Sequence, residues 1–152
     1  MYTRQEASRI KQAFWTTYGQ YMRPVPSASG EKVNWVNYKT GIKHIYFRMH
    51  ADRKGAYIAI ELTHPNLTIQ QKQYDQLLQM RSLLKEQLNE SWDWLPMTRD
   101  DYGKIISQVK KELPDVNIFN QDEWPELISF FKPRIIALDA FWSFARYSFE
   151  PF

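Results

Sequence analysis

The residues best suited to chemistry or binding lie between Tyr38 and Glu61. Positions 39 to 54 hold five basic residues and one acidic residue, whereas the whole chain carries a formal net charge of only +3. The rings of Tyr38, Tyr46 and His50 are interleaved with these cations. Because cations can contact phosphates while rings stack on bases, this stretch is a candidate nucleic-acid-binding surface. Its candidate residues are Tyr38, Lys39, Lys43, Tyr46, Arg48, His50, Arg53 and Lys54.

Glu61 is a second candidate polar site. It shares the expected polar strand face with Tyr46, Arg48 and His50. An Arg or His beside a carboxylate can set its pKa for proton transfer. The competing interpretation, which we favour, is a cross-strand Glu–Arg or Glu–Tyr pair that stabilises a partly solvated sheet.

Other chemical signatures are missing from the sequence. The chain has no cysteine, which excludes disulfides, thiolate catalysis and Cys-based zinc sites. Its five glycines are scattered, so it has no glycine-rich phosphate cradle. His44 and His50 would lie about 20 Å apart along one strand, too far to share a metal. The triplet from Asp52 to Lys54 has the spacing of a nuclease metal motif but falls in a turn. We therefore predict no catalytic residue, no metal site and no cofactor.

The candidate surface requires a β-hairpin to hold it. Residues 44–51 and 56–63 alternate between apolar and polar side chains, and this period of two predicts two strands with one buried face each. A turn at residues 52–55 joins them. A second turn signal at residues 39–41 predicts a preceding strand over residues 33–38. Symmetric closure of the hairpin pairs Met49 with Ile58, Phe47 with Ile60, Tyr46 with Glu61, and His50 with Tyr57.

Helical patterns flank the hairpin. The spacing of apolar residues predicts a helix over residues 3–22, opened by a capping box. Thr68 is predicted to cap a second helix that continues to Glu90. A last helical region begins near Trp124, and Pro133 inside it predicts either a kink or two abutting helices.

Hairpins flanked by helices predict an α+β fold, with an antiparallel sheet built from β-hairpins and helices packed on its apolar face. The expected order is α-β-β-β-α-β-β-α, with the last two strands near residues 92–94 and 104–112. Residues 1–152 are predicted to form a single domain. The last helical region should bury an apolar stripe against Phe47, Ile58 and Ile60; this stripe consists of Trp124, Phe131, Leu138 and Trp142.

Composition sets the remaining limits. Aromatic residues make up 16% of the chain, which predicts a core built from rings. No apolar run is long enough to span a membrane, so we predict no membrane partner. The first residues lack the apolar region of a secretion signal, so we expect a cytoplasmic location.

Several sequence blocks resemble a bacterial family known as domain-of-unknown-function family 4268. They are Glu6-Ala7, Phe14-Trp15, residues 34–41, 47–49, 56–61 and 116–120, Trp124-Pro125, and residues 128–139. Similar domains look like C-terminal portions of proteins whose N-terminal part is nuclease-like. The resemblance therefore implies a stand-alone accessory module, and it carries over no catalytic residue.

Three classes of function remain open from the sequence. The leading hypothesis is a non-enzymatic binding module that contacts nucleic acid through the basic hairpin. The alternative is a protein-interaction or homo-oligomerisation module, because Tyr147, Phe149 and Phe152 follow the last helix and could form an apolar docking patch. The least favoured hypothesis is an enzyme that uses Glu61.

Overall fold

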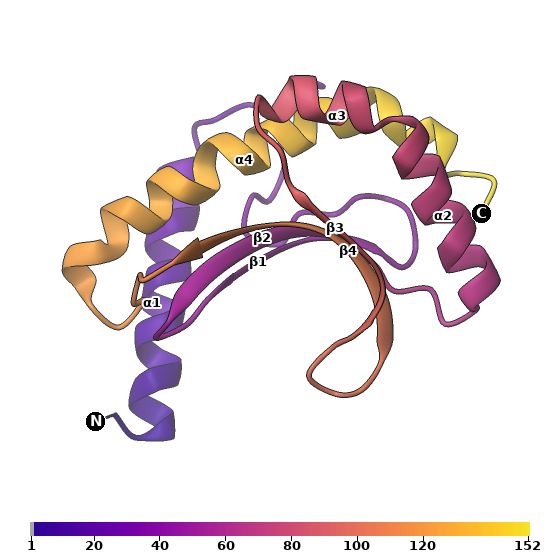
Figure 1. Cartoon of the computed structure of the whole chain (residues 1–152). Helices are drawn as coiled ribbons and strands as arrows, with labels where there is room; N and C mark the ends of the chain where they lie inside the picture. Colours follow the sequence, from indigo (N-terminus) through magenta and orange to yellow (C-terminus); the bar gives the residue numbers. More distant parts are fainter. Residues whose placement is uncertain (1) are drawn as a thin grey trace.

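The computed structural model describes residues 2–152 and shows one four-stranded antiparallel sheet with helices around it (Figure 1). The α+β prediction is confirmed. The strands lie in the order β1-β2-β4-β3. The elements are α1 (Arg4–Met22), β1 (Ile45–Ala51), β2 (Gly55–Leu62), α2 (Leu67–Gln79), α3 (Arg81–Leu88), β3 (Asp93–Arg99), β4 (Ile105–Pro114), α4 (Trp124–Ala145) and the 3-10 turns η1 (Gln121–Glu123) and η2 (Arg146–Ser148).

The β1–β2 hairpin closes in the predicted register. Its four predicted pairs, including Tyr46 with Glu61 and His50 with Tyr57, are all present. The turn is fixed by Asp52, whose Oδ1 accepts hydrogen bonds from the backbone N–H groups of Lys54 (2.8 Å) and Gly55 (3.1 Å). An Asp at the start of a turn stabilises it in this way, which leaves the register little freedom to slip.

The element order differs from the prediction, because no strand forms over residues 33–38. Asn34 accepts hydrogen bonds from the backbone N–H groups of Val36 and Asn37, which bends the chain locally. The indole of Trp35 donates to the carbonyl of Val25, so this segment packs back on its own loop. The observed order is α-β-β-α-α-β-β-α, counting α-helices and strands.

The predicted second helix is split in two at Met80. Asn66, rather than Thr68, caps its start, and its side-chain oxygen accepts from the N–H groups of residues 68 and 69. The break changes the helix direction, so that α2 packs on β2 and β4 while α3 packs on α4. Tertiary packing of this kind commonly overrides a continuous helical pattern.

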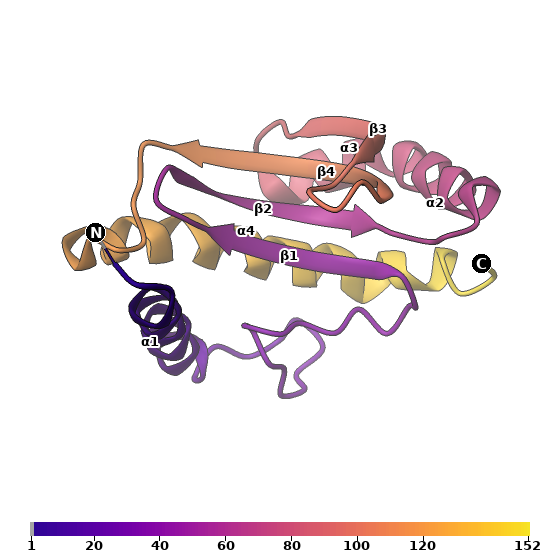
Figure 2. The ribbon, with the colours of Figure 1, turned by 90° about the horizontal axis from the view of Figure 1, so that it is seen from below.

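The outer helices begin and end close to the predicted positions. Thr3 caps α1 by accepting a hydrogen bond from the N–H of Glu6 at 3.1 Å. Pro133 lies inside one continuous α4, so the alternative of two abutting helices is wrong. The views in Figures 1 and 2 agree that α1 lies beside β1, and the Tyr18 hydroxyl contacts the Met49 sulfur at 3.6 Å.

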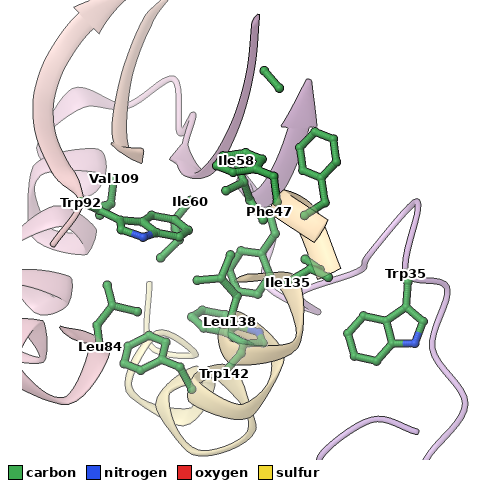
Figure 3. Close-up of a cluster of buried hydrophobic side chains, with 14 of the residues drawn as sticks. Trp35, Phe47, Ile58, Ile60, Leu84, Trp92, Val109, Ile135, Leu138 and Trp142 are labelled. Atoms are coloured by element: carbon green, nitrogen blue, oxygen red, sulfur yellow. The ribbon is translucent and has the colours of Figure 1, made fainter. Parts of the chain in front are cut away.

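Aromatic rings fill the core between α4 and the sheet, as predicted (Figure 3). Phe131, Leu138 and Trp142 are buried, and the Trp142 ring meets Phe47 edge to face at 5.5 Å. The prediction is wrong for Trp124, which is only partly buried. Its indole instead donates to a loop carbonyl, because the start of α4 extends beyond the sheet toward α1.

Across residues 2–152, no helix has the length and apolar character needed to cross a membrane.

Candidate nucleic-acid interface

The helices cover only one face of the sheet. Figure 1 shows α2, α3 and α4 on the convex side of an arched sheet, and Figure 2 shows the strands from the other side with no described helix in front of them. This concave surface, here called the open face, contains a cleft of about 670 Å³. All four strands and the β3–β4 loop line it, with Tyr46, Arg48, Tyr57, Glu61, Arg99, Gln108 and Lys110 from the strands and residues 100–102 and 104 from the loop.

Glu61 lies at the floor of the cleft and is only 6% exposed. One carboxylate oxygen accepts from Arg48 Nε at 3.1 Å, and the other accepts from Gln108 Nε2 at 2.7 Å. Both oxygens therefore have a partner supplied by a neighbouring strand. This arrangement is the cross-strand pair favoured from the sequence, and it ties β1, β2 and β4 together.

Two ring–cation pairs lie on the open face. Arg48 lies over the Tyr46 ring at 5.3 Å, and Lys110 lies over the Tyr57 ring at 5.2 Å. His50 on β1 stacks on the ring of Tyr57, its cross-strand partner on β2, with ring centroids 5.1 Å apart. Burial, followed by the charge of Glu61, raises the pKa of Tyr57 to about 12. The Tyr57 hydroxyl is therefore protonated at neutral pH and can donate a hydrogen bond.

The β3–β4 loop contributes a site residue that the sequence analysis missed. Asp100 Oδ1 accepts from the backbone N–H groups of Tyr102 (2.9 Å) and Lys104 (2.8 Å), and Arg99 Nη1 donates to the Gly103 carbonyl at 2.9 Å. These bonds fix a tight turn in which Gly103 has φ of 77°. The turn projects on the open side of the sheet (Figure 1) and leaves Tyr102 95% exposed. The sequence signal was Asp100 followed by a Tyr-Gly turn.

The structure separates the predicted basic residues into two groups. Arg53 and Lys54 are exposed at the β1–β2 turn, whereas Lys39 and Lys43 precede β1 at its opposite end. A seven-residue strand places these groups about 20 Å apart. Only Tyr46, Arg48 and His50, of the predicted set, are brought together on the open face.

Tyr38 does not reach the open face. Its ring stacks on the core residue Phe47 at 5.1 Å, and its hydroxyl donates to Asp139 at 2.5 Å. Asp139 is buried on α4 and also accepts from Ser27 Oγ (3.0 Å) and the N–H of Ala28 (2.8 Å). This carboxylate holds the long connection between α1 and β1 against α4, so the Tyr38 hydroxyl has a structural partner.

Two histidines meet beside the cleft, which the sequence analysis did not foresee. The rings of His44 and His64 lie 4.7 Å apart, because residue 63 pairs with residue 44 beyond the end of β1. Desolvation and then the nearby His64 lower the pKa of His44. Within residues 2–152, no group of three His, Cys, Asp or Glu side chains is placed to hold a metal ion.

The predicted C-terminal docking patch does not form as proposed. Phe149 is fully buried and packs on Trp142 with ring centroids 5.2 Å apart. The tail therefore folds back on the core. Phe144, Tyr147 and Phe152 remain exposed around this end of the molecule.

These features define a small α+β protein whose antiparallel sheet has one helix-covered face and one uncovered, polar face. The chain belongs to the family described as Domain of unknown function (DUF4268), whose model matches residues 10–146. No curated protein and no solved structure matches the sequence.

Proposed function

We propose that this protein is a non-enzymatic module that binds nucleic acid on the open face of its sheet. The observation that carries the proposal is the uncovered concave surface, where rings and cations from several strands line one cleft. Antiparallel sheets with aromatic and basic side chains on an uncovered face are a recurrent surface for nucleic-acid binding. The proposal takes residues 1–152 as one domain acting in the bacterial cytoplasm.

The charges of the cleft support this ligand. Four cations line it, Arg48, Arg99, Lys104 and Lys110, together with three carboxylates. Glu61 is paired with Arg48, and Asp100 is occupied by loop N–H groups. Lys110 pairs with Glu112 at 3.5 Å, so Arg99 and Lys104 are the lining cations that form no ion pair within residues 2–152 and can meet phosphates. Lys54 adds an exposed cation at the hairpin turn, outside the cleft.

The expected salt dependence follows from the number of these cations. With about three phosphate contacts, the logarithm of the affinity for a single strand should fall with the logarithm of salt at a slope of about −2. Between 50 and 200 mM salt this slope means roughly a 20-fold loss of affinity. A much steeper slope would indicate binding through charges elsewhere on the chain.

Fluorescence anisotropy with labelled DNA and RNA oligonucleotides at these two salt concentrations tests the proposal. A Lys54/Lys104/Lys110 triple Ala variant should bind weakly, with its slope reduced by about 2. The matched control removes the same charge from the covered side, at the exposed residues Lys72, Arg81 and Lys85 of α2 and α3. Equal losses in the two triple variants, or no binding by the parent protein at 50 mM salt, would refute the proposal.

A second candidate function is protein interaction or self-association through the C-terminal end. It is favoured by the exposed rings of Phe144, Tyr147 and Phe152, of which Tyr147 is 62% exposed. Sedimentation velocity of the parent and of a Tyr147→Ser/Phe152→Ser variant tests self-association without disturbing buried Phe149. A monomer in both cases, over the accessible concentration range, excludes self-association by this patch.

A further inference from the structure

Among the large hydrophobic residues from 2 to 152, Tyr102 is the most exposed. The backbone of its loop is nevertheless fixed by hydrogen bonds. Its loop is fixed by two hydrogen bonds to Asp100 and one from Arg99 to the Gly103 carbonyl. The loop projects on the open side of the sheet (Figure 1). Its residues 100–102 line the cleft. A ring presented on an ordered loop loses little entropy when a ligand stacks on it.

We propose that the ligand of the open face is single-stranded nucleic acid and that Tyr102 stacks on one of its unpaired bases. This inference rests on the proposed function and specifies its ligand. Stacking requires a base whose flat face is accessible, and the bases of a duplex cover each other's faces. Exposed rings on an uncovered sheet can therefore stack on the bases of a single strand but not on the paired bases inside a duplex.

The neighbours of Tyr102 suit a strand that passes from the loop onto the sheet. Arg99 and Lys104 flank the turn, and neither forms an ion pair with any residue from 2 to 152. They can meet phosphates on either side of a stacked base. Tyr46, which is 42% exposed, offers a second ring on β1 across the same cleft.

The test compares Tyr102→Ala and Tyr102→Phe with the parent protein in anisotropy titrations of a single-stranded 12-mer. Loss of one stacked base should weaken binding by about 5- to 150-fold in the Ala variant. The Phe variant keeps the ring and should stay within about 2-fold of the parent. Tyr147→Ala is the matched control, because it removes another exposed tyrosine, which lies in η2 after α4 and does not line the cleft.

Two further readouts separate stacking from charge. The salt slope of Tyr102→Ala should equal that of the parent, because the substitution removes no phosphate contact. A duplex of the same sequence should bind at least about 10-fold more weakly than the single strand, because its base faces are covered.

The outcomes distinguish this inference from the proposed function. Parent-like binding by Tyr102→Ala, equal binding of duplex and single strand, or equal losses in the Ala and Phe variants would each overturn the inference. The proposed function would survive these results if the cation variant still lost binding. Absence of oligonucleotide binding by the parent protein would overturn both.

Discussion

Trp142 provides the sharpest test of how α4 packs on the sheet. It is 2% exposed, and its ring lies between Phe47 at 5.5 Å and Phe149 at 5.2 Å. Its indole Nε1 also donates a hydrogen bond of 2.6 Å to the backbone carbonyl of Thr40, in the loop before β1. Trp142→Ala therefore removes a large buried ring and a hydrogen bond at once.

The expected cost is about 3–5 kcal/mol of the free energy of unfolding, the usual range for truncating a buried Trp or Phe to Ala. For a chain of this size, each kcal/mol lowers the melting temperature by roughly 2–4 °C, so the midpoint should fall by about 6–20 °C. Trp142→Phe keeps most of the ring and leaves the Thr40 carbonyl without its donor, which should cost about 1–3 kcal/mol.

Thermal and urea unfolding, followed by circular dichroism, measure both changes. Phe144→Ala is the matched control on the same helix, because Phe144 is exposed, and it should cost less than about 1 kcal/mol. A Trp142→Ala protein that melts within about 2 °C of the parent would show that α4 packs by a different face. The open face was identified because α2, α3 and α4 cover the opposite face of the sheet. A different packing of α4 would therefore also remove the structural basis of the open face.

Three other predictions concern polar groups. Glu61→Ala should lower the free energy of unfolding by about 1–3 kcal/mol, because Arg48 and Gln108 lose their shared acceptor, and a neutral result in urea melts would contradict the cross-strand role. Because the pKa of His44 is lowered in the folded protein, the unfolded chain takes up a proton first as the pH falls through about 6.5. Stability should therefore decline below that pH, and His44→Asn, which tolerates the φ of 70° at this position, should decline less in melts from pH 8 to 5. Gln73 is fully buried and finds no hydrogen-bond partner within residues 2–152 for either amide atom, so Gln73→Met should raise the melting temperature by about 2–6 °C, and a decrease in calorimetry would refute this.

The parts of the fold that follow from local patterns were predictable from the sequence. Residues 44–51 and 56–63 alternate with a period of two and are joined by an Asp-initiated turn, so both the strands and their register could be derived. The start of α1 followed from the Thr3 cap in the same way. In each case the information lies within about 20 neighbouring residues.

The failures concern segments whose conformation depends on distant partners. Residues 33–38 have the composition of a strand, but the contacts of Trp35 and Tyr38 with Val25 and Asp139 hold them as a loop. His44 and His64 meet because residues 44 and 63 still pair beyond the end of β1. His44 has a positive φ at this point, and the alternation of the strand does not predict that conformation. The alternation of residues predicts which face of a strand a side chain occupies, but it does not predict how exposed that side chain is. For this reason the sequence did not single out Tyr102, which lies in a turn.

The attachment of the first long loop to the last helix has a consequence for folding during synthesis. Ser27 and Tyr38 bond to Asp139 across 112 and 101 residues, and Trp142 bonds to Thr40 across 102 residues. At about 5–20 residues per second, a ribosome needs roughly 5–20 s to make the partners of this loop after the loop itself. The strands can pair earlier, because all four precede α4 in the chain. The sheet is therefore able to pair while its loop is still unattached, and the loop can acquire its final conformation only when the end of α4 has left the ribosome.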